Sequence, residues 1–449
     1  MRRTLIRSLP IAVVLFFIEG IAFAQDGGIS RGDTAWMLAS SALVLFMTPG
    51  LALFYGGMVR SKNVLTTIMH SFIAMGVISV LWVLVGYSLA FGGDSSLIGN
   101  LEWLGFNGVS VFEPNPDYGA TIPHQLYAVY QGMFAIITPA LITGGFAERK
   151  KFSSYLVFLI LWSLLVYCPI AHWVWGKGGW LRSLGTTTGG GTVGALDFAG
   201  GTVVHISSGI TALVAALIIG RRRGYPGEEM RPNNLTMTML GTGILWFGWF
   251  GFNAGSAVAA NGVAVNAFVV TNTAAAMAAL AWMAAEWTYR GKPTTLGAAS
   301  GAVAGLVGIT PAAGFVNPLG AIAIGIGAGV LCYSAVIMKT KLGYDDSLDT
   351  FGVHAVGGTW GALATGLFAV PVLCQAATGV KDHGGGLLAG NPQQFLFQAT
   401  GVVATIVYAA VVSAILLFII NAVIGLRVKS GEEDAGLDVS LHGEEGYIL

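Results

Sequence analysis

The chain reads Asp197-Phe-Ala-Gly-Gly-Thr-Val-Val-His205 in its first half and Asp346-Ser-Leu-Asp349-Thr-Phe-Gly-Val-His354 in its second. In both stretches a histidine follows an aspartate by eight residues, and a glycine-containing apolar segment comes next. Ionisable side chains inside an apolar segment are energetically costly, so they indicate a functional site. The repeated spacing therefore bears on both the fold and the site.

The composition is that of a membrane protein. Of the 449 residues, 55% are hydrophobic and 10% are charged, whereas an average soluble domain has about 25% charged residues. The mean hydropathy is +0.73. The 65 glycines are about twice the usual share of roughly 7%, and small residues let membrane helices pack closely. We therefore predict a tightly packed, all-α polytopic membrane protein.

Charge and cysteine content argue against several kinds of ligand. The 22 basic and 22 acidic residues balance, so nothing indicates a nucleic-acid partner. Cys168, Cys332 and Cys374 show no CxxC spacing, and no further His, Cys or Glu stands at metal-ligand spacing near the two histidines. We predict no metal and no cofactor, and three buried free thiols.

Residues 1–24 have the pattern of a cleavable signal peptide. A positively charged start precedes an apolar run over residues 11–18, and Ala22-Phe-Ala24 fits a small-x-small cleavage site. The alternative is an uncleaved first membrane span, but Glu19 and Gly20 interrupt the run. Cleavage would place the mature N-terminus outside the cytoplasm.

Eleven apolar segments follow that are long enough to cross a bilayer, which takes about 20 residues. Two groups of five form repeat one, at about 33–219, and repeat two, at about 235–371, and a long final helix follows at about 395–425. The transmembrane domain is thus predicted over residues 25–429, followed by an acidic cytoplasmic regulatory tail, residues 430–449. The approximate bounds of the segments are 33–57, 64–91, 125–147, 152–174, 197–219, 235–256, 265–288, 295–315, 319–338, 349–371 and 395–425.

Basic residues determine the predicted orientation. Fifteen Lys and Arg residues fall in the connections after the odd-numbered segments, and four fall on the opposite side. Because cytoplasmic connections carry the excess of Lys and Arg, the N-terminus is predicted outside and the C-terminus inside. This orientation agrees with the signal peptide.

Because each repeat has five segments, the second must enter the membrane inverted. Asp197 then lies at the outer end of the fifth segment, and Asp346 lies at the inner end of the tenth. Eight helical residues rise about 12 Å, close to half of a hydrocarbon core about 30 Å thick. His205 and His354 are therefore predicted to meet near mid-depth, where inverted-repeat transporters have their binding site.

Each candidate residue also has a purely structural interpretation. A histidine in a helix is most often a satisfied core residue, but a matched inverted pair favours a pore in which neutral imidazoles donate and accept hydrogen bonds. Asp197 would cap its helix and also add negative potential that attracts cations to the outer mouth. For Asp346 and Asp349 we predict a structural capping role.

Aromatic and hydroxyl side chains near the outer face extend the candidate site. Trp175 ends the fourth segment, where its indole face can hold a small cation, although interfacial tryptophans are common. Ser256 ends the sixth segment and can hydrogen-bond either a polar solute or its own helix. The third segment contains Tyr130-Gln-Gly-Met-Phe134, in which Phe134 is core-like by composition.

Several long motifs extend this pattern over essentially the whole mature chain. They read Leu51-Ala-Leu-Phe-Tyr-Gly-Gly57, Asp197-Phe-Ala-Gly-Gly-Thr-Val-Val-His205, Trp249-Phe-Gly-Phe-Asn-Ala-Gly-Ser256, Gly301-Ala-Val-Ala-Gly-Leu-Val-Gly308, Phe351-Gly-Val-His354 and Gly436-Leu-Asp-Val-Ser-Leu-His-Gly443. With these motifs the sequence resembles the ammonium transporter family (Amt/Mep, distantly related to Rh proteins), in its bacterial branch.

The resemblance implies an ammonium recruitment site at the outer face. By position, Trp175 and Ser256 match the residues that recruit ammonium, and Asp197 matches the acidic residue that supports them. One departure is Tyr130, where the family commonly has an outer phenylalanine. A tyrosine keeps an aromatic face for the cation and adds a hydroxyl group, so Tyr130 is expected to contribute to recruitment.

The resemblance also implies the parts below that site. Phe134 and Phe252 match a stacked aromatic gate, and His205 and His354 match a twin-histidine pair in a narrow hydrophobic pore. The family further implies a homotrimer with one pore per subunit, a location in the bacterial inner membrane, and a tail that couples to PII-type signalling proteins. The mature N-terminus would then be periplasmic.

The predicted mechanism follows from the cost of an ion in an apolar pore. Ammonium or methylammonium would lose its proton below the recruitment site, and the neutral amine would pass the gate while the histidines relay the proton. An ammonium sensor and an electroneutral ammonia channel on the same fold are alternatives. We predict no enzymatic activity, because an intramembrane hydrolase would need a nucleophile beside one of the histidines.

Overall fold

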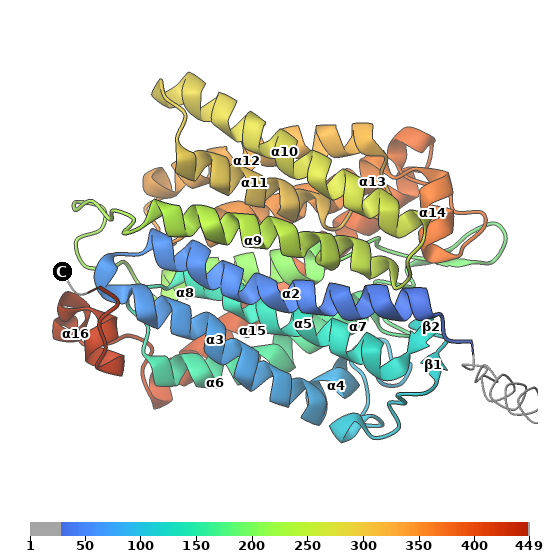
Figure 1. Ribbon diagram of the computed structural model, residues 1–449, viewed down its shortest axis with the longest axis horizontal. Coiled ribbons are helices and arrows are strands. Elements are labelled where there is room, and N and C mark those ends of the chain that lie inside the picture. The colour runs from blue at the N-terminus through green and yellow to red at the C-terminus, as the bar shows by residue number, and fades with distance from the viewer. Residues whose placement is uncertain (1–27, 448–449) are drawn as a thin grey trace, which may run out of the picture.

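The computed structural model describes residues 28–447. Its long helices lie side by side, and the first described residues and α16 (Ser430–Ala435) lie at opposite ends of the bundle (Figure 1). We call the end with β2 (Gly119–Pro123) and α14 (Pro371–Thr378) the hairpin end, and the end with α16 the tail end. The predicted signal peptide, residues 1–24, lies outside the described residues.

Helices occupy all eleven segments that the sequence predicts to cross a membrane. Among the described residues, nine continuous helical segments are long and apolar enough to cross, and a bent pair makes up to ten. The predicted fold class, a mostly helical multi-pass membrane protein, is thus confirmed. In chain order the helices are α2 (Arg31–Met58), α3–η2–α4 (Val64–Leu81, Trp82–Gly86, Tyr87–Phe91), α5 (His124–Ile142), α6–η5–α7 (Phe152–Trp162, Ser163–Tyr167, Cys168–Trp175), η6–α8 (Gly201–Ile206, Ser207–Ile219), α9 (Leu235–Ala254), α10 (Gly262–Arg290), α11 (Thr295–Ile309), α12 (Pro318–Leu342), η8–α13 (Phe351–Ala355, Val356–Phe368) and α15 (Pro392–Val423).

Two of the predicted segments are not simple spans. Helix α11 has 15 residues, a length of about 22 Å, because it ends before Pro311, which cannot continue a helix. It packs against both α10 and α12. The tenth segment ends at Phe368 and then bends by 110° into α14, which begins at Pro371.

Short elements cover the two ends of the bundle. At the hairpin end, β1 (Pro114–Asn115) pairs with β2, and β3 (Gly185–Thr186) pairs with β4 (Thr192–Val193), both antiparallel. The remaining helical turns are η1 (Ser61–Asn63), η3 (Leu104–Phe106), η4 (Thr143–Gly145), η7 (Gly255–Ala257), η9 (Leu387–Ala389) and η10 (Asp438–His442).

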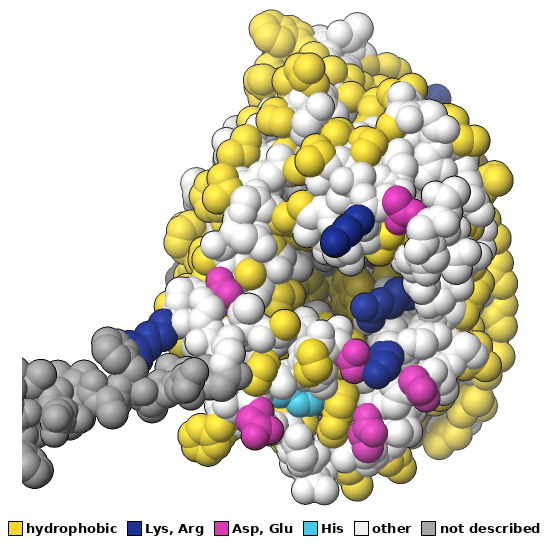
Figure 2. Space-filling view, turned by 90° about the vertical axis from the view of Figure 1, so that its right-hand side faces the viewer, with side chains coloured by type: hydrophobic (Ala, Val, Ile, Leu, Met, Phe, Trp, Pro, Cys, Tyr) yellow, Lys and Arg dark blue, Asp and Glu magenta, His cyan; other side chains and the backbone are white. Residues whose placement is uncertain are grey.

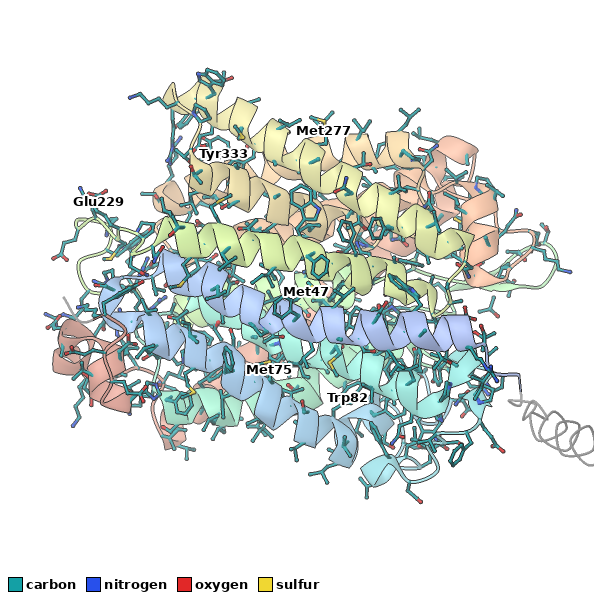
Figure 3. All side chains as sticks on the ribbon, in the orientation of Figure 1. Met47, Met75, Trp82, Glu229, Met277 and Tyr333 are labelled. Atoms are coloured by element: carbon teal, nitrogen blue, oxygen red, sulfur yellow. The ribbon has the colours of Figure 1, made fainter. Side chains whose placement is uncertain are left out.

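Glycines let the helices of the bundle touch backbone to backbone. A Cβ on Gly241 of α9 would clash with the backbone nitrogen of Phe54 in α2. Two turns further along, a Cβ on Gly248 would clash with the side chain of Met47, which Figure 3 labels between α2 and α9. The high glycine content thus serves close helix packing, as small residues do in membrane proteins generally.

The two aspartate–histidine stretches enter the bundle from opposite ends. The η6–α8 segment follows the strands of the hairpin end, whereas η8–α13 runs toward that end and continues into α14 (Figure 1). The two segments cross where a Cβ on Gly209 would clash with the backbone of Ala355 and one on Gly358 would lie 2.9 Å from the Gly201 carbonyl oxygen. This crossing brings their first turns together.

One detail of the predicted geometry is wrong. The helices begin at Gly201 and Phe351, several residues after the aspartates, so eight helical residues do not separate each aspartate from its histidine. Left-handed residues cause the difference, because Gly200 has φ +113° and Asp349 has φ +61°. The carboxylates of Asp197 and Asp346 instead reach forward to the first turns.

The acidic tail folds against the tail end of the bundle. The Asp438 carboxylate of η10 accepts hydrogen bonds from the backbone N–H groups of Leu65 and Thr66, at 2.9 and 2.7 Å, and so caps α3 from a distant part of the chain. Glu433 of α16 forms an ion pair with Arg427 at 2.8 Å. The tail is therefore anchored to the membrane domain by side chains of both segments.

Candidate functional site

A cavity of about 440 Å³ opens at the hairpin end, and we call it the vestibule. Figure 2 views this end and shows it hollowed near the centre, with acidic and basic side chains around the hollow. Aromatic, polar and charged side chains line the vestibule, among them Tyr118, Tyr127, Phe134, Trp175, Asp197 and Ser256. The vestibule is therefore lined by residues of α5, α7, η7 and α14 together with loop residues, and four of the predicted site residues belong to it.

Trp175 and Asp197 are held together by a hydrogen bond. The indole Nε1 of Trp175 donates to the backbone carbonyl of Asp197 at 2.8 Å. The Asp197 carboxylate is buried and accepts hydrogen bonds from the backbone N–H groups of Gly200, Gly201 and Thr202, each at 2.7 Å, and from the Thr202 hydroxyl. Asp197 therefore caps η6 and fixes the Trp175 ring at the wall of the vestibule.

Ser256 also lines the vestibule, and Tyr130 lies behind it. The Ser256 hydroxyl donates to the Phe252 carbonyl at 2.9 Å and lies 3.2 Å from the Tyr130 hydroxyl. Tyr130 is fully buried, and its hydroxyl group lies 2.9 Å from the carbonyl oxygens of Gly251 and Phe252. Its ring is not part of the vestibule wall, so it can act on a solute only through its neighbours.

Two phenylalanine rings separate the vestibule from a second, smaller cavity. Phe134 and Phe252 are stacked, with ring centroids 4.1 Å apart and an angle of 29° between their planes. Phe134 lines the vestibule, whereas Phe252 lines the smaller cavity beyond it. The Phe134 ring also meets the Trp175 ring edge to face, with centroids 6.0 Å apart. The stacked pair is thus the partition between the two cavities.

The two histidines meet beyond this partition. Their Nδ1 atoms are 3.2 Å apart, and their rings are nearly parallel, with centroids 5.3 Å apart. Because one Nδ1 must donate and the other accept, the two neutral rings carry opposite tautomers. His205 also stacks on Trp249, with centroids 5.5 Å apart. Its Nε2 atom has no hydrogen-bond partner within residues 28–447.

The smaller cavity, here the histidine cavity, has room for one water-sized molecule. Its volume is about 10 Å³, at the lower limit for holding a single water. Apart from His205 and His354, its lining is apolar and includes Phe54, Leu141, Trp249 and Phe252. A solute there finds the imidazoles as its principal side-chain hydrogen-bonding partners.

The two remaining candidates lie at the tail end, before η8. One carboxylate oxygen of Asp346, Oδ2, accepts a hydrogen bond from the Phe351 N–H at 2.7 Å. Asp349 instead binds the ammonium group of Lys339, which also donates to the Asp346 backbone carbonyl at 2.8 Å. Of the two aspartates, Asp346 thus caps η8 and Asp349 forms an ion pair.

The structure also brings in residues that the sequence did not single out. Four of them line the vestibule: Tyr127 and Gln131 on α5, and Tyr118 and His383 in loops. Gln131 directly follows Tyr130, so its polarity within an apolar segment was a usable signal. His383 lies in a polar loop where nothing in the local sequence distinguishes it.

A metal site finds no support in the described part of the chain. No group of three or more His, Cys, Asp or Glu side chains is arranged there to hold a metal ion. Cys168, Cys332 and Cys374 are buried and unpaired with one another.

Comparison with known proteins identifies the family. The model of the Ammonium Transporter Family matches residues 35–447. The chain is 51% identical to an ammonium transporter of Bacillus subtilis (strain 168) over 421 residues, which cover 93% of this chain and 99% of that protein. It is also 51% identical to an ammonium transporter of Aquifex aeolicus (strain VF5) over 445 residues, 98% of this chain and 99% of the relative.

Solved structures agree with these sequence matches. The crystal structure of Saccharomyces cerevisiae Mep2 superposes with a TM-score of 0.82 at 39% identity, covering 90% of this chain and 91% of Mep2. A structure described as a sensor Amt protein superposes with a TM-score of 0.81 at 28% identity, covering 92% of this chain and 98% of that one. The sequence and the fold thus lead to one conclusion, that this chain belongs to the ammonium transporter family.

Proposed function

We propose that the protein takes ammonium or methylammonium from the vestibule and passes the neutral amine through the histidine cavity. The observation that carries this proposal is the pair of imidazoles, with Nδ1 atoms 3.2 Å apart, in an otherwise apolar cavity behind two stacked phenyl rings. The names of the relatives in Bacillus subtilis and Aquifex aeolicus support the substrate.

Recruitment would take place at the vestibule wall. The Trp175 ring offers a cation–π contact, and the Ser256 hydroxyl can accept a hydrogen bond from the ammonium ion. Asp197 acts indirectly, because its carbonyl holds the indole and its carboxylate adds negative potential. Since the Tyr130 ring is fully buried, we assign it a supporting role: its hydroxyl group positions Ser256, and its ring does not face the cation.

Deprotonation is required before the phenylalanine partition. An ammonium ion in a cavity of this size would lose nearly all of its hydration, and an unpaired ion in apolar surroundings is heavily penalised. Ammonia is small enough for the histidine cavity and can both donate to and accept from the two rings. The proton would then follow through His205 and His354, whose Nδ1 contact provides a transfer step.

The proposal also includes the membrane, the orientation and the partners of the protein. We place it in the bacterial inner membrane with the hairpin end and the mature N-terminus in the periplasm and the tail end in the cytoplasm, on the distribution of basic residues. A homotrimer and a PII-type partner at the tail end follow from the family resemblance. For the partner, the anchored position of the tail supplies a contact surface.

Proteoliposomes test the transport mechanism. We expect ammonium addition to give both uptake and a transient inward positive current on a solid-supported membrane. Replacing both His205 and His354 by leucine should abolish the current while leaving the fold intact by size-exclusion profile. Uptake without current from the unmodified protein would support an electroneutral ammonia channel and refute proton relay. Binding without uptake would support a sensor, the role that the name of one structural neighbour suggests.

A further inference from the structure

His172, in the last turn of α7, has two ring nitrogens that both lie against carbonyl oxygens. Its Nδ1 atom lies 3.0 Å from the carbonyl oxygen of Ala90, and its Nε2 atom lies 2.6 Å from that of Ser95. The residue is fully buried. A carbonyl oxygen can only accept a hydrogen bond, whereas a neutral imidazole has one donor and one acceptor. In a neutral His172, one nitrogen lone pair would therefore face a carbonyl oxygen.

Other histidines of the protein have partners that suit a neutral ring. His205 and His354 face each other through their Nδ1 atoms, so that one donates and the other accepts. The Nδ1 atom of His383 accepts a hydrogen bond from the Gly385 N–H at 3.1 Å. Within residues 28–447, no histidine other than His172 has both ring nitrogens against carbonyl oxygens.

The surroundings of the ring favour a positive charge. Ala90 and His172 each belong to the last turn of a helix, α4 and α7, and helix C-terminal ends carry partial negative charge. Ser95 lies in the loop over residues 92–98, which follows α4. A buried charge is costly unless hydrogen bonds replace its hydration, and here each N–H group of a protonated ring has an acceptor. The 2.6 Å distance to Ser95 is as short as charge-assisted hydrogen bonds are.

The carbonyl oxygens, and not a carboxylate, hold this charge. None of the ion pairs in the described part of the chain involves His172. Asp94 is exposed in the loop after α4. Lys177 pairs with Asp117 at 2.9 Å, and Arg182 donates to the last carbonyl of α7 at 2.8 Å. The other titratable side chains on α7 and on the elements packed against it are Tyr87 of α4, Tyr167 of η5, Cys168 of α7 and His205 of η6.

The loop after α4 is tied to the end of α7 by further hydrogen bonds. The indole Nε1 of Trp173 donates to the Leu97 carbonyl at 2.7 Å, and the Trp180 N–H donates to the Ser96 carbonyl at 3.2 Å. His172 contributes one contact to this loop through Nε2 and one to α4 through Nδ1. A single ring thus joins α4, the loop and α7.

Two residues of the vestibule wall are attached at the same place. Trp175 follows His172 by three residues, and the next residue, Gly176, lies so close to the ring that a Cβ there would be 2.5 Å from Nδ1. The Phe91 carbonyl, adjacent to the one that Nδ1 contacts, accepts a hydrogen bond from the Tyr118 hydroxyl at 2.6 Å. Both Trp175 and Tyr118 line the vestibule. A displaced ring would therefore shift two parts of the wall.

We propose that His172 is a buried imidazolium that positions the vestibule wall. Its two N–H groups donate to the carbonyl oxygens of Ala90 and Ser95, and they hold the end of α4 and the following loop against α7. The ring does not line the vestibule, so it acts on a solute through Trp175 and Tyr118. This role in uptake rests on the proposed function, whereas the charge of the ring does not.

Nuclear magnetic resonance of the unmodified protein in lipid bilayers measures the charge. The protein carries ¹³C and ¹⁵N labels in histidine and ¹⁵N in tryptophan. His172 is the only histidine that a tryptophan follows in the sequence, so its signals can be assigned without a variant. At about pH 8 an imidazole in water is almost entirely neutral. We expect both ring nitrogens of His172 to carry a proton at that pH. One protonated and one unprotonated nitrogen would overturn the proposal.

Methylammonium uptake into proteoliposomes measures the positioning role. His172→Gln keeps a donor near the place of Nε2 and loses the one at Nδ1, whereas His172→Leu loses both. We expect KM to rise about two- to tenfold in His172→Gln, the equivalent of one hydrogen bond, and further in His172→Leu, with a smaller change in the maximal rate.

The matched control is His442→Gln, the same substitution at the tail end, which should keep the unmodified KM. An unchanged KM in His172→Gln would overturn the positioning role, and this variant decides the matter if His172→Leu does not fold. If the unmodified protein takes up no methylammonium, the proposed function fails instead, and the charge of His172 is still decided by its ring nitrogens.

Discussion

Replacing Asp197 by asparagine removes the charge from a carboxylate whose two oxygens both accept hydrogen bonds. Asp197 Oδ1 accepts from the Gly200 and Gly201 N–H groups at 2.7 Å, and Oδ2 accepts from the Thr202 N–H and hydroxyl. In the variant one oxygen becomes an NH₂ group. If that group replaces Oδ2, it faces the Thr202 N–H, and a buried donor loses its acceptor.

The expected loss of stability follows from these bonds. One buried N–H without an acceptor costs about 1–3 kcal/mol, and the two bonds that remain lose charge assistance worth about 1 kcal/mol each. The sum is about 4 kcal/mol. With an unfolding entropy of about 2.1 cal/mol/K per residue over about 420 residues, the Tm should fall by about 5 °C. Ammonium uptake should fall as well, because the Asp197 carbonyl holds the Trp175 indole.

Thermal unfolding of the purified protein in detergent measures this change. The matched control is Asp382→Asn, since Asp382 also accepts from a threonine hydroxyl and a glycine N–H but is exposed. We expect no resolved shift in the control. If Asp197→Asn has the same Tm as the control and the unmodified protein, the carboxylate is not the cap that holds η6, and the reasoning fails.

Three further changes test separate parts of the structure. Tyr130→Phe removes a buried hydroxyl that bonds two carbonyl oxygens and contacts Ser256, so it should cost about 1–2 kcal/mol and raise the KM for ammonium uptake; an unchanged KM would contradict its supporting role. Gly209→Val should abolish transport, since its side chain would clash with the backbone of Ala355 at the helix crossing, and retained uptake would show that the crossing can relax. For Lys150, burial lowers the pKa to about 7, so the unfolded chain binds the extra proton between pH 7 and about 10, and stability should rise with pH across this window. Thermal melts of Lys150→Met should lack that rise, and an identical pH profile would contradict it.

Much of the fold could be predicted because membrane insertion leaves strong local signals. An apolar run of about 20 residues is visible without any tertiary contact, and the bias of Lys and Arg predicts which connections face the cytoplasm. Two of the predicted segments are not simple membrane-spanning helices. Helix α11 stops before Pro311, and α13 stops at Phe368, because the chain there turns within the protein rather than at a lipid boundary.

The candidate site was predictable in its residue types but not in its contacts. Trp175, Ser256 and Phe134 share the vestibule, and the two histidines meet at 3.2 Å. Tyr130 differs, because its hydroxyl group finds two backbone carbonyls and the ring turns into the core. No sequence pattern states which carbonyl oxygens a hydroxyl group will find.

By itself, the sequence determined the membrane location, the number of helical segments and the paired spacing of Asp197–His205 and Asp346–His354. These features follow from hydrophobic length and from an odd number of segments per repeat, and both are properties of the chain read in order. Only the tertiary structure decided how well each aspartate is satisfied. Hydrogen bonding depends on donors brought together in space. Asp197 Oδ1 accepts from the Gly200 and Gly201 N–H groups, whereas the buried Asp346 Oδ1 has no hydrogen-bond partner among the described residues.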